Sequence, residues 1–380
     1  QTTEGVSVPA AQGKALVTVP AFGMVSLQKG AGAKPAVLAT AVKTVEGAEL
    51  ASDLVRVKLN AAGQIISYTL KGREMAAQPM NQLRMYKDTP RLFDAWDIDS
   101  NYREQESFTP VVDSLTVACA EGLTASVTWH GTIGSSTLQQ TISVQVGSPV
   151  VTFDTTVDWH ETHRLLKTAF PVDVRAENAL HEIQFGYVER PTHRSRVCDQ
   201  QRFEVCNHRY TALCDNSHGC AVLNDCKYGV GVWENSIELT LLRAATSPDM
   251  VSDQGEHHFR YGFTAWEGAF ADAPVVQQGL DFNESVAVIP GRAAQFSAFR
   301  VDAPNIILDT LKPAEDGSGD LVLRLYESKR ADTTFRLTSS LPVKGYQLCN
   351  LLEQPQGDVL PPDAALHAGA FQVLTLRVKL

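Results

Sequence analysis

The chain has 380 residues, of which 44% are hydrophobic and 20% charged, a composition that is ordinary for a folded protein and excludes a disordered or fibrous one. With 33 basic and 43 acidic residues the net charge is −10, which argues against a nucleic-acid partner or an anionic membrane surface. The sequence has no run of about eighteen apolar residues, so no membrane-spanning helix is predicted.

The amino end of the sequence carries no typical targeting segment. It begins with Gln1 instead of Met and lacks the charged start and apolar stretch of a signal peptide. The seven cysteines are an odd number in a long chain, which favours reduced thiols over a disulfide framework. We therefore expect a cytoplasmic location, and we expect the chain to be a piece of a longer polypeptide.

Alternation of apolar and polar residues with a period of two recurs along the whole sequence. It predicts strands over Leu54–Leu59 and Gln64–Leu70, joined by a hairpin turn, and over Val151–Trp159. Such strands bury one face and leave the other in water, as antiparallel sheets do. Helical periodicity is scarce, with short candidates only around Ala76–Met85 and Thr211–Asn216. The predicted fold class is all-β, built from sandwiches of large antiparallel sheets.

Two segments rich in glycine, proline and other small residues, 29–48 and 311–319, are typical of connectors. They divide the chain into three predicted parts. These are a leading strand unit with its connector at 1–48, a large sandwich at 49–310 and a small carboxy-terminal sandwich at 311–380.

The densest cluster of aromatic and acidic residues is Phe93–Asp99. If this segment is extended, Trp96 and Ile98 point to one side and Asp97 and Asp99 to the other, with the two carboxylates about 7 Å apart. Carboxylates at that distance suit a cation clamp or paired acid and base roles, as in inverting glycosidases. The alternative is a structural strand anchored by Trp96, whose aspartates cap turns or pair with neighbouring arginines.

A polar stretch at 189–209 concentrates histidine, arginine and glutamate in an otherwise strand-rich chain. Such loops hold sugar hydroxyls through directional hydrogen bonds, which makes Arg190, His193 and Glu204 candidate sugar contacts. His193 or His208 paired with Glu204 also suits acid and base catalysis. A solvated loop with salt bridges explains the same composition equally well.

The potential metal ligands are not spaced for metal binding. His160 and His163 are one residue too close for the helical zinc-protease motif and face opposite sides of a strand. Five cysteines between 198 and 226 lack the paired spacing of structural zinc sites. Glycine-rich phosphate loops do not occur either. We therefore expect that this chain binds no metal and no cofactor. We also expect its cysteine thiols to be free and mostly buried.

Several sequence blocks occur in a characteristic order: FDAWDIDSNYRE (93–104), DWHETHRLLKTAFPVDVRA (158–176), QFGYVERPTH (184–193), RFEV (202–205), LNDCKYG (223–229), LRAATSPD (242–249), LRLYES (323–328) and LTLRVKL (374–380). They resemble the carboxy-terminal part of glycoside hydrolase family 38 α-mannosidases, especially the bacterial and the cytosolic or vacuolar branch. Phe93 departs from the family, which usually has tryptophan at this position.

The resemblance implies a large supersandwich like that of galactose mutarotases, followed by a small β-sandwich. It also implies that the nucleophile, the acid/base and a divalent metal, usually zinc, belong to an amino-terminal catalytic domain that these 380 residues do not include. The chain is then a non-catalytic part of a retaining enzyme that hydrolyses terminal α-mannosides, and it is expected to be inactive alone. It buttresses the catalytic domain of the same polypeptide and rims its active site.

No catalytic residue is expected in this chain. The residues expected to touch a mannose-containing oligosaccharide are Trp96 and Asp97, then Arg190, His193 and Glu204.

Two other functions fit the same fold. A stand-alone carbohydrate-binding protein needs an exposed aromatic platform, whereas the five tryptophans mostly fall in alternating strands typical of a core. A mutarotase-like epimerase needs a His/Glu pair on a concave sheet. The face that docks the catalytic domain is expected to be apolar, so the isolated chain is expected to form homo-oligomers.

Overall fold

The computed structural model describes residues 9–11, 14–27, 33, 35–291 and 293–380. The chain divides into two compact units. The large unit is formed by residues 35–182 and 188–285, and the small unit by residues 1–34, 183–187 and 286–380. Residues 1–8, 12–13, 28–32 and 34 of the predicted leading segment lie outside the described residues.

These bounds differ from the predicted divisions at residues 48 and 310, because strands on either side of each predicted division pair with one another or with distant segments. β4 (Ala39–Lys43) and β5 (Gly47–Ala51) pair with each other, and β5 pairs with β6 (Val55–Asn60), so both belong to the large unit. β3 (Gly23–Met24) pairs with β25 (Phe296–Ser297), which joins the leading residues to the carboxy-terminal part.

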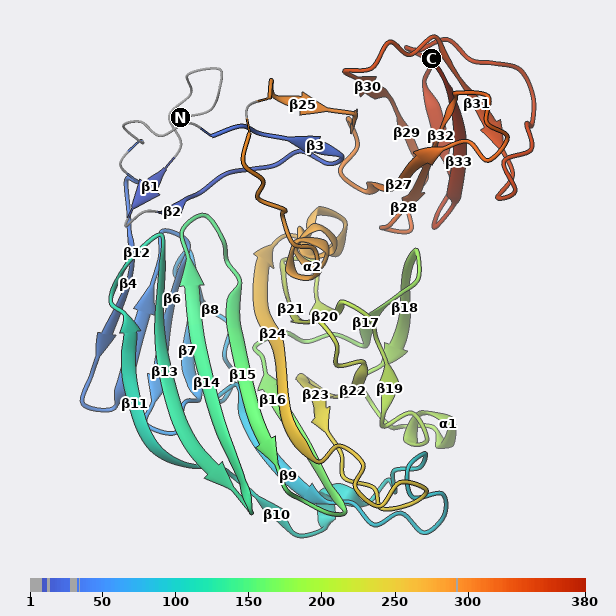
Figure 1. The fold of residues 1–380 in the computed structure, drawn as a ribbon. Helices are drawn as coiled ribbons and strands as arrows, with labels where there is room; N and C mark the ends of the chain where they lie inside the picture. The colour runs from blue at the N-terminus through green and yellow to red at the C-terminus, as the bar shows by residue number, and fades with distance from the viewer. Residues whose placement is uncertain (1–8, 12–13, 28–32, 34, 292) are drawn as a thin grey trace. The chain divides into compact units, whose positions relative to one another are not determined.

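Three antiparallel sheets build the large unit (Figure 1). Sheet A has nine strands in the order β11 (Val111–Cys119), β13 (Thr124–Ile133), β14 (Ser136–Gln145), β15 (Val151–Trp159), β24 (Gly255–Glu267), β21 (His218–Asn224), β20 (Tyr210–Cys214), β17 (Asn178–Ile183) and β18 (Gly186–Pro191). Sheet B has six, β12 (Glu121–Gly122), β4, β5, β6, β7 (Ile65–Leu70) and β8 (Arg73–Glu74). Sheet C has six, β10 (Ser107–Phe108), β9 (Gln82–Lys87), β16 (Arg164–Pro171), β23 (Ser236–Leu242), β22 (Gly229–Trp233) and β19 (Val205–Cys206).

One core is shared by the three sheets, and β24 lies at its centre. The Phe263 ring of β24 is 4.9 Å from that of Tyr68 in sheet B and 5.6 Å from that of Phe170 in sheet C. All three side chains are fully buried. Burial of one such ring contributes about 2–3 kcal/mol relative to exposure, so this strand ties both other sheets to sheet A.

The predicted all-β class is confirmed, and the strand at Val151–Trp159 has the predicted bounds and alternating burial. The two predicted helices are wrong. Residues 82–85 belong to β9 and residues 211–214 to β20, because the apolar side chains of these segments enter the shared core from strands. The helices are instead α1 (Val197–Gln200), α2 (Val275–Asn283) and the 3₁₀ turns η1 (Tyr102–Glu104) and η2 (Phe270–Asp272). Among the described residues, no helix is long and apolar enough to cross a membrane.

The small unit has its own apolar core, which includes Phe299, Leu323, Tyr346 and Leu376. Its largest sheet has the order β27 (Ile306–Pro313), β28 (Leu321–Glu327), β33 (Val373–Lys379) and β31 (Gly345–Cys349). Its strand pairs are β1 (Ala10–Ala11) with β2 (Lys14–Ala15), β25 with β3, β26 (Phe299–Val301) with β30 (Leu337–Ser339), and β29 (Thr333–Phe335) with β32 (Leu366–Ala368).

Candidate functional site

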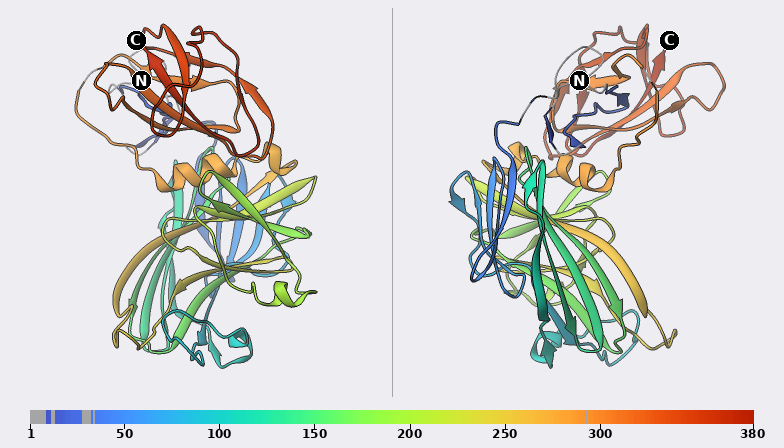
Figure 2. Two further views of the ribbon diagram at one scale, coloured as in Figure 1. Left: turned by 90° about the vertical axis from the view of Figure 1, so that its right-hand side faces the viewer. Right: turned by 60° about the vertical axis from the view of Figure 1, so that its left-hand side comes forward.

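The loop between β9 and β10, residues 88–106, carries the motif FDAWDID and is called the Trp96 loop here. It lies with the loop from β23 to β24 at one end of the large unit in Figures 1 and 2. The motif is turned and not extended. The backbone N–H groups of Trp96 and Asp97 both donate to the Phe93 carbonyl, at 2.8 and 2.9 Å. The extended reading, with carboxylates paired along one strand face, is therefore wrong.

Asp94 fastens the Trp96 loop to the neighbouring loop and to His163. Its Oδ2 accepts hydrogen bonds from the backbone N–H groups of Thr246 at 2.7 Å and Ser247 at 3.1 Å. The same oxygen lies 3.1 Å from Nε2 of His163. Burial acts to raise the pKa of Asp94, but the hydrogen bonds from Thr246 and His163 outweigh it and hold this pKa below its ordinary value. The ionised carboxylate is therefore the anchor.

Arg243 holds the same loop from its other side. Its Nε is 2.7 Å from Oδ2 of the buried Asp88. Its Nη1 donates to the Ala95 carbonyl at 3.1 Å, and its Nη2 donates to the carbonyls of Asp94 and Asp97 at 3.2 and 2.7 Å. One guanidinium thus fixes three backbone positions of the turn, a geometry that the five fixed donors of arginine allow.

The anchored turn presents large apolar side chains to water. The exposed fractions are 56% for Leu92, 65% for Phe93 and 71% for Trp96. Phe93 has a φ of +52°, a conformation unusual for a residue with a side chain. Trp96 differs from Trp129, Trp159 and Trp266, which are buried as predicted. The alternative of a structural strand anchored by Trp96 is wrong as to the strand and the anchor, whereas one of its aspartates, Asp99, does bind the backbone N–H of Arg91.

The end of the Trp96 loop covers a charged cluster on the outer face of sheet C. Leu166 of β16 belongs to the shared core, so its neighbour Lys167 points to the opposite face, where it is 2% exposed. Its ammonium group binds Oε1 of Glu204 and donates to the hydroxyl of Thr240 at 3.0 Å. The Tyr102 hydroxyl also donates to Oε1 of Glu204, at 2.8 Å. The Thr240 hydroxyl donates to Oε2 of Glu204 at 3.2 Å, so Glu204 is held by three side chains from three segments.

Two arginines complete this outer-face cluster, defined as Tyr102, Arg103, Lys167, Arg194, Glu204, Glu238 and Thr240. Arg103 Nη2 lies 2.9 Å from Oε2 of Glu238. Arg194 stacks over Trp233, with Cζ at 3.9 Å from the ring centroid. Burial, and then the charge of Arg103, lower the pKa of Arg194. Within the described residues, Nη2 of both arginines and Oε2 of Glu238 are buried without an aligned hydrogen-bond partner.

The predicted sugar contacts fall into different surroundings. Glu204 is bound to Lys167, Tyr102 and Thr240, as described above. His193 accepts a hydrogen bond from the Ser195 N–H at 3.3 Å and lies 3.9 Å from Asp199. Arg190 donates to the Cys206 carbonyl at 3.4 Å. His193 and Glu204 therefore have different partners in the described contacts. The sequence instead allowed an acid–base pair in which these two side chains contact each other.

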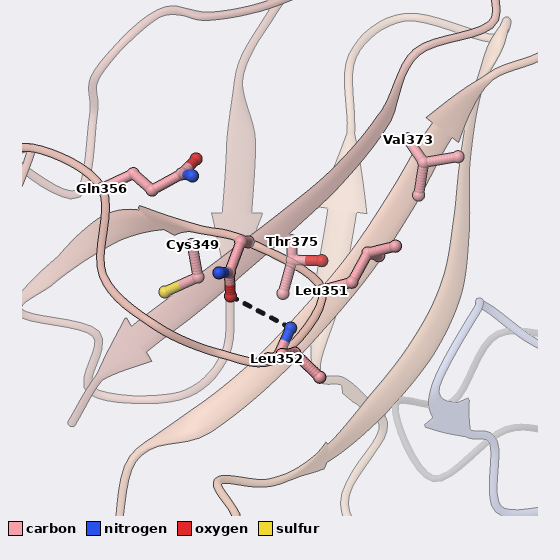
Figure 3. A pocket seen from close by; sticks show the side chains of 7 residues that line it. Cys349, Leu351, Leu352, Gln356, Val373 and Thr375 are labelled. Carbon is pink, nitrogen blue, oxygen red and sulfur yellow. Dashed lines mark hydrogen bonds between the residues drawn. The ribbon is translucent and has the colours of Figure 1, made fainter.

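The small unit contains an open hollow of about 450 Å³ beside β33 (Figure 3). A hydrogen bond of 3.0 Å from the Leu352 N–H to the Asn350 side chain shapes its rim. The Thr375 hydroxyl in it is buried without a hydrogen-bond partner among the described residues. Its lining residues are Cys349, Asn350, Leu351, Leu352, Gln356, Val373 and Thr375. The hollow contains none of the predicted contact residues.

Of the seven cysteines only Cys220 and Cys349 are buried, so the expectation of mostly buried thiols is wrong. Among the described residues, no group of three or more histidine, cysteine, aspartate or glutamate side chains is arranged to hold a metal ion. His160 instead lies 2.9 Å from Asp158 and His163 beside Asp94. The described residues thus do not fit the divalent metal of the resembled enzymes.

Sequence reasoning missed Arg243, Lys167 and Tyr102 as parts of the site. Lys167 breaks the apolar run of a buried strand, which is the one local signal that a partner is required. Arg243 similarly follows the apolar end of β23. Their partners are distant in sequence, by 155 residues for Arg243 and Asp88, so spacing rules could not pair them.

Comparison with known proteins identifies the family. The model of the glycosyl hydrolases family 38 C-terminal domain matches residues 50–251, and that of the family 38 C-terminal beta sandwich domain matches residues 305–376. Alpha-mannosidase 2C1 of Homo sapiens is 37% identical over 96% of this chain and 37% of its own length. Alpha-mannosidase G of Dictyostelium discoideum is 35% identical over 72% of this chain and 26% of its own length.

The crystal structure of an alpha-mannosidase from Enterococcus faecalis V583 has the same fold, with a TM-score of 0.75 and 16% identity over 92% of this chain and 44% of that one. The chain thus spans less than two-fifths of the length of the curated relatives it matches. The first match falls mostly in the large unit and the second in the small unit. The chain belongs to glycosyl hydrolase family 38 and corresponds to its C-terminal region.

Proposed function

We propose that this chain is the carboxy-terminal, non-catalytic part of an α-mannosidase that hydrolyses terminal α-mannosides. The observation that carries the proposal is the match of two family 38 C-terminal domain models to residues 50–251 and 305–376, while the curated relatives are more than twice as long. The catalytic portion then belongs to the same polypeptide. The odd number of seven cysteines in a long chain supports a cytoplasmic location.

In this proposal the chain supplies position and surface, and the catalytic portion supplies the reacting groups of a retaining glycosidase. We derive no step through the divalent metal, since the described residues offer no cluster to hold one. A zinc ion is therefore assigned to the catalytic portion. What the chain contributes is a rigid scaffold whose Trp96 loop is held at both sides by Asp94 and Arg243.

Among the predicted sugar contacts, Asp97, Arg190 and His193 have the exposure that contact with a mannose-containing oligosaccharide requires. Asp97 and His193 are exposed, and Arg190 is partly so. The Glu204 side chain is 12% exposed, and its ionic contact with Lys167 suits a positioning role for the segment that carries His193. The fifth residue, Trp96, is considered in the next subsection.

The test is hydrolysis of an aryl α-mannoside by two proteins, the 380-residue chain and the complete polypeptide that contains it. We expect turnover by the complete polypeptide and none by the chain alone. A β-mannoside serves as the matched control substrate. Turnover by the chain alone, or none by the complete polypeptide, overturns the proposal.

A further inference from the structure

We infer that the apolar side chains of the Trp96 loop, Leu92, Phe93 and Trp96, form the surface that packs against the catalytic portion of the same polypeptide. We call these three residues the Trp96 surface. The inference rests on the proposed function, because that function supplies the partner. It concerns where the partner docks, which is separate from the reaction that the partner performs.

The first argument is exposure. Each side chain of the Trp96 surface is more than half exposed, with fractions of 56, 65 and 71%. The neighbouring loop, joined through Thr246 and Ser247, adds Met250 and Val251 at 78 and 66%. Large apolar side chains that gather on adjoining loops mark surfaces that are covered by another protein.

The second argument is rigidity. Asp94 and Arg243 make the hydrogen bonds that fix the turn, and Phe93 keeps a positive φ of +52° within it. An exposed loop needs no such framework to remain in water. A framework that orders aromatic anchors before binding lowers the entropy cost of association, which is the property expected of a docking surface.

The third argument separates a protein partner from a sugar. A sugar site combines an aromatic ring with polar groups that are free to bind hydroxyls. Around Trp96 the Asp94 carboxylate accepts from Thr246 and Ser247, and the carbonyls of Ala95 and Asp97 accept from Arg243. Asp99 accepts from the Arg91 N–H. Toward solvent the turn presents the Trp96 ring beside apolar neighbours, with the exposed Asp97 carboxylate next to them, which is the composition of an apolar interface centre with a polar rim.

The length of the relatives identifies the occupant. The chain aligns over 96% of its residues with Alpha-mannosidase 2C1 of Homo sapiens but covers 37% of that protein. Most of such a polypeptide therefore lies outside the matched region and is attached to it covalently. A covalently attached partner is present at high effective concentration, so a small aromatic surface suffices to hold it.

Hydroxyl-radical footprinting with mass spectrometry tests the inference on Trp96 and Phe93. In the isolated chain both rings should be labelled rapidly, and the buried Trp129 and Trp159 should not be labelled. In the complete polypeptide, labelling of Trp96 should fall about tenfold, because the centre of a stable interface is desolvated. Unchanged labelling of Trp96 in a complete polypeptide that still hydrolyses an α-mannoside overturns the docking surface and leaves the proposed function intact.

Two other occupants are distinguished by the same readout. Protection of Trp96 in the isolated chain upon addition of a mannose-containing oligosaccharide identifies a sugar platform and overturns the inference. Protection that appears in the isolated chain only as its concentration rises identifies a second copy, with the same consequence. A complete polypeptide without α-mannosidase activity refutes the proposed function, whatever the labelling shows.

A substitution gives an independent test. Trp96→Ala should leave the melting temperature of the isolated chain unchanged, because the ring is 71% exposed there. In the complete polypeptide the same substitution should lower the melting temperature by several degrees. Val45→Ala, at a residue that is fully exposed in the turn after β4, is the matched control and should change neither protein. Equal effects of Trp96→Ala on both proteins refute the docking surface.

Discussion

Two polar networks in the large unit show different solutions to burying polar groups. The first, called the core network, lies inside the sandwich and consists of Asn81, Gln140, Thr155, Thr168 and Tyr261, all at most 2% exposed. Its groups are neutral, and each makes a side-chain hydrogen bond within the network. The second is the outer-face cluster, which buries formal charges beneath the Trp96 loop.

The difference lies in how completely each network satisfies its atoms. In the core network the Gln140 amide donates to Thr155 and Tyr261, and its oxygen accepts from Asn81 and Trp129. In the outer-face cluster, Nη2 of Arg194 is buried without a hydrogen-bond partner within the described residues, and Nη2 of Arg103 is held in an ion pair with Glu238 at 2.9 Å. A satisfied neutral network stabilises one packing of a core, whereas the outer-face cluster depends on buried charges that pair with one another.

The largest expected effect comes from breaking the ion pair of the outer-face cluster. Lys167→Met leaves the Glu204 carboxylate without its cation in a site where Lys167 is 2% and Glu204 12% exposed. We expect the free energy of unfolding in urea to fall by about 3–5 kcal/mol, the usual cost of an unpaired buried charge. Lys167→Met combined with Glu204→Gln should recover part of the loss. A loss below about 1 kcal/mol contradicts a buried pair.

A smaller loss is expected from the core network. Gln140→Met keeps the volume but removes partners of Tyr261, Thr155 and Asn81. Because Tyr261 still donates to Asn81, we expect the free energy of unfolding to fall by about 2–3 kcal/mol. Urea denaturation measures it, and Gln145→Met, at the exposed end of β14, is the control. If the Gln140→Met protein is as stable as the parent, the core network does not contribute to the free energy of unfolding.

His181 tests what happens when a neutral buried group is charged. It is 1% exposed beside the Thr211 hydroxyl at 3.0 Å, and burial, assisted by Arg190, lowers its pKa from 6.5 to about 3. The unfolded chain binds a proton below pH 6.5 and the folded chain does not, so stability is complete above 6.5 and declines as the pH falls toward 3.

The expected loss from His181 is about 2 kcal/mol between pH 7 and pH 5. Urea denaturation at both pH values measures it. The same comparison with His181→Gln, which cannot take up a proton, should show a smaller dependence on pH. An identical dependence in the two proteins shows that His181 does not titrate on unfolding.

The smallest effect is local. Asp94→Ala removes the acceptor for Thr246 and Ser247, so the Trp96 loop should open more often without unfolding the sandwich. Amide hydrogen exchange at Trp96 and Asp97 should accelerate about tenfold, which corresponds to about 1.4 kcal/mol of local stability. Arg56→Ala, which breaks an exposed pair with Glu49, should alter neither exchange nor stability by more than about 0.5 kcal/mol.

The stabilisation of the Trp96 loop by Asp94 is expected to weaken as the pH falls. Hydrogen bonds lower its pKa below the ordinary 3.8, so its contribution is present above that pH and is lost as the pH falls through the lower folded value. Exchange at Trp96 should therefore accelerate in acid in the parent protein, beyond its intrinsic pH dependence. Equal acceleration in Asp94→Ala excludes this carboxylate as the cause.

The fold was predictable where the pattern is local. The alternation in Val151–Trp159 determines both the strand and its buried face, since the period of two is fixed by strand geometry. The segment around Ala76–Met85 misled because Ala76, Met80 and Leu83 are spaced by four and three residues, as on one face of a helix, yet all three pack into a core formed by distant strands. Tertiary packing overrides such a weak local preference.

The site was predictable only in part. The sequence FDAWDID identified the Trp96 loop, but it could not distinguish an extended segment from a turn. The turn depends on Arg243, which is 146 residues away from Asp97. Likewise, Glu204 was recognised as a polar residue of interest, whereas its partner Lys167 lies on another strand. Contacts between distant segments leave no spacing in the sequence.

The position of β24 has a consequence for how the chain is made. One half of sheet A consists of β11, β13, β14 and β15 and the other of β17, β18, β20 and β21, and β24 lies between β15 and β21. During synthesis both halves emerge from the ribosome before the strand that joins them, so each has an open edge until Glu267 is available. Pairings of such long sequence separation form slowly. A nascent chain paused before β24 therefore exposes two unpaired strand edges, which makes this stage of translation the point at which misassembly and chaperone binding are to be sought.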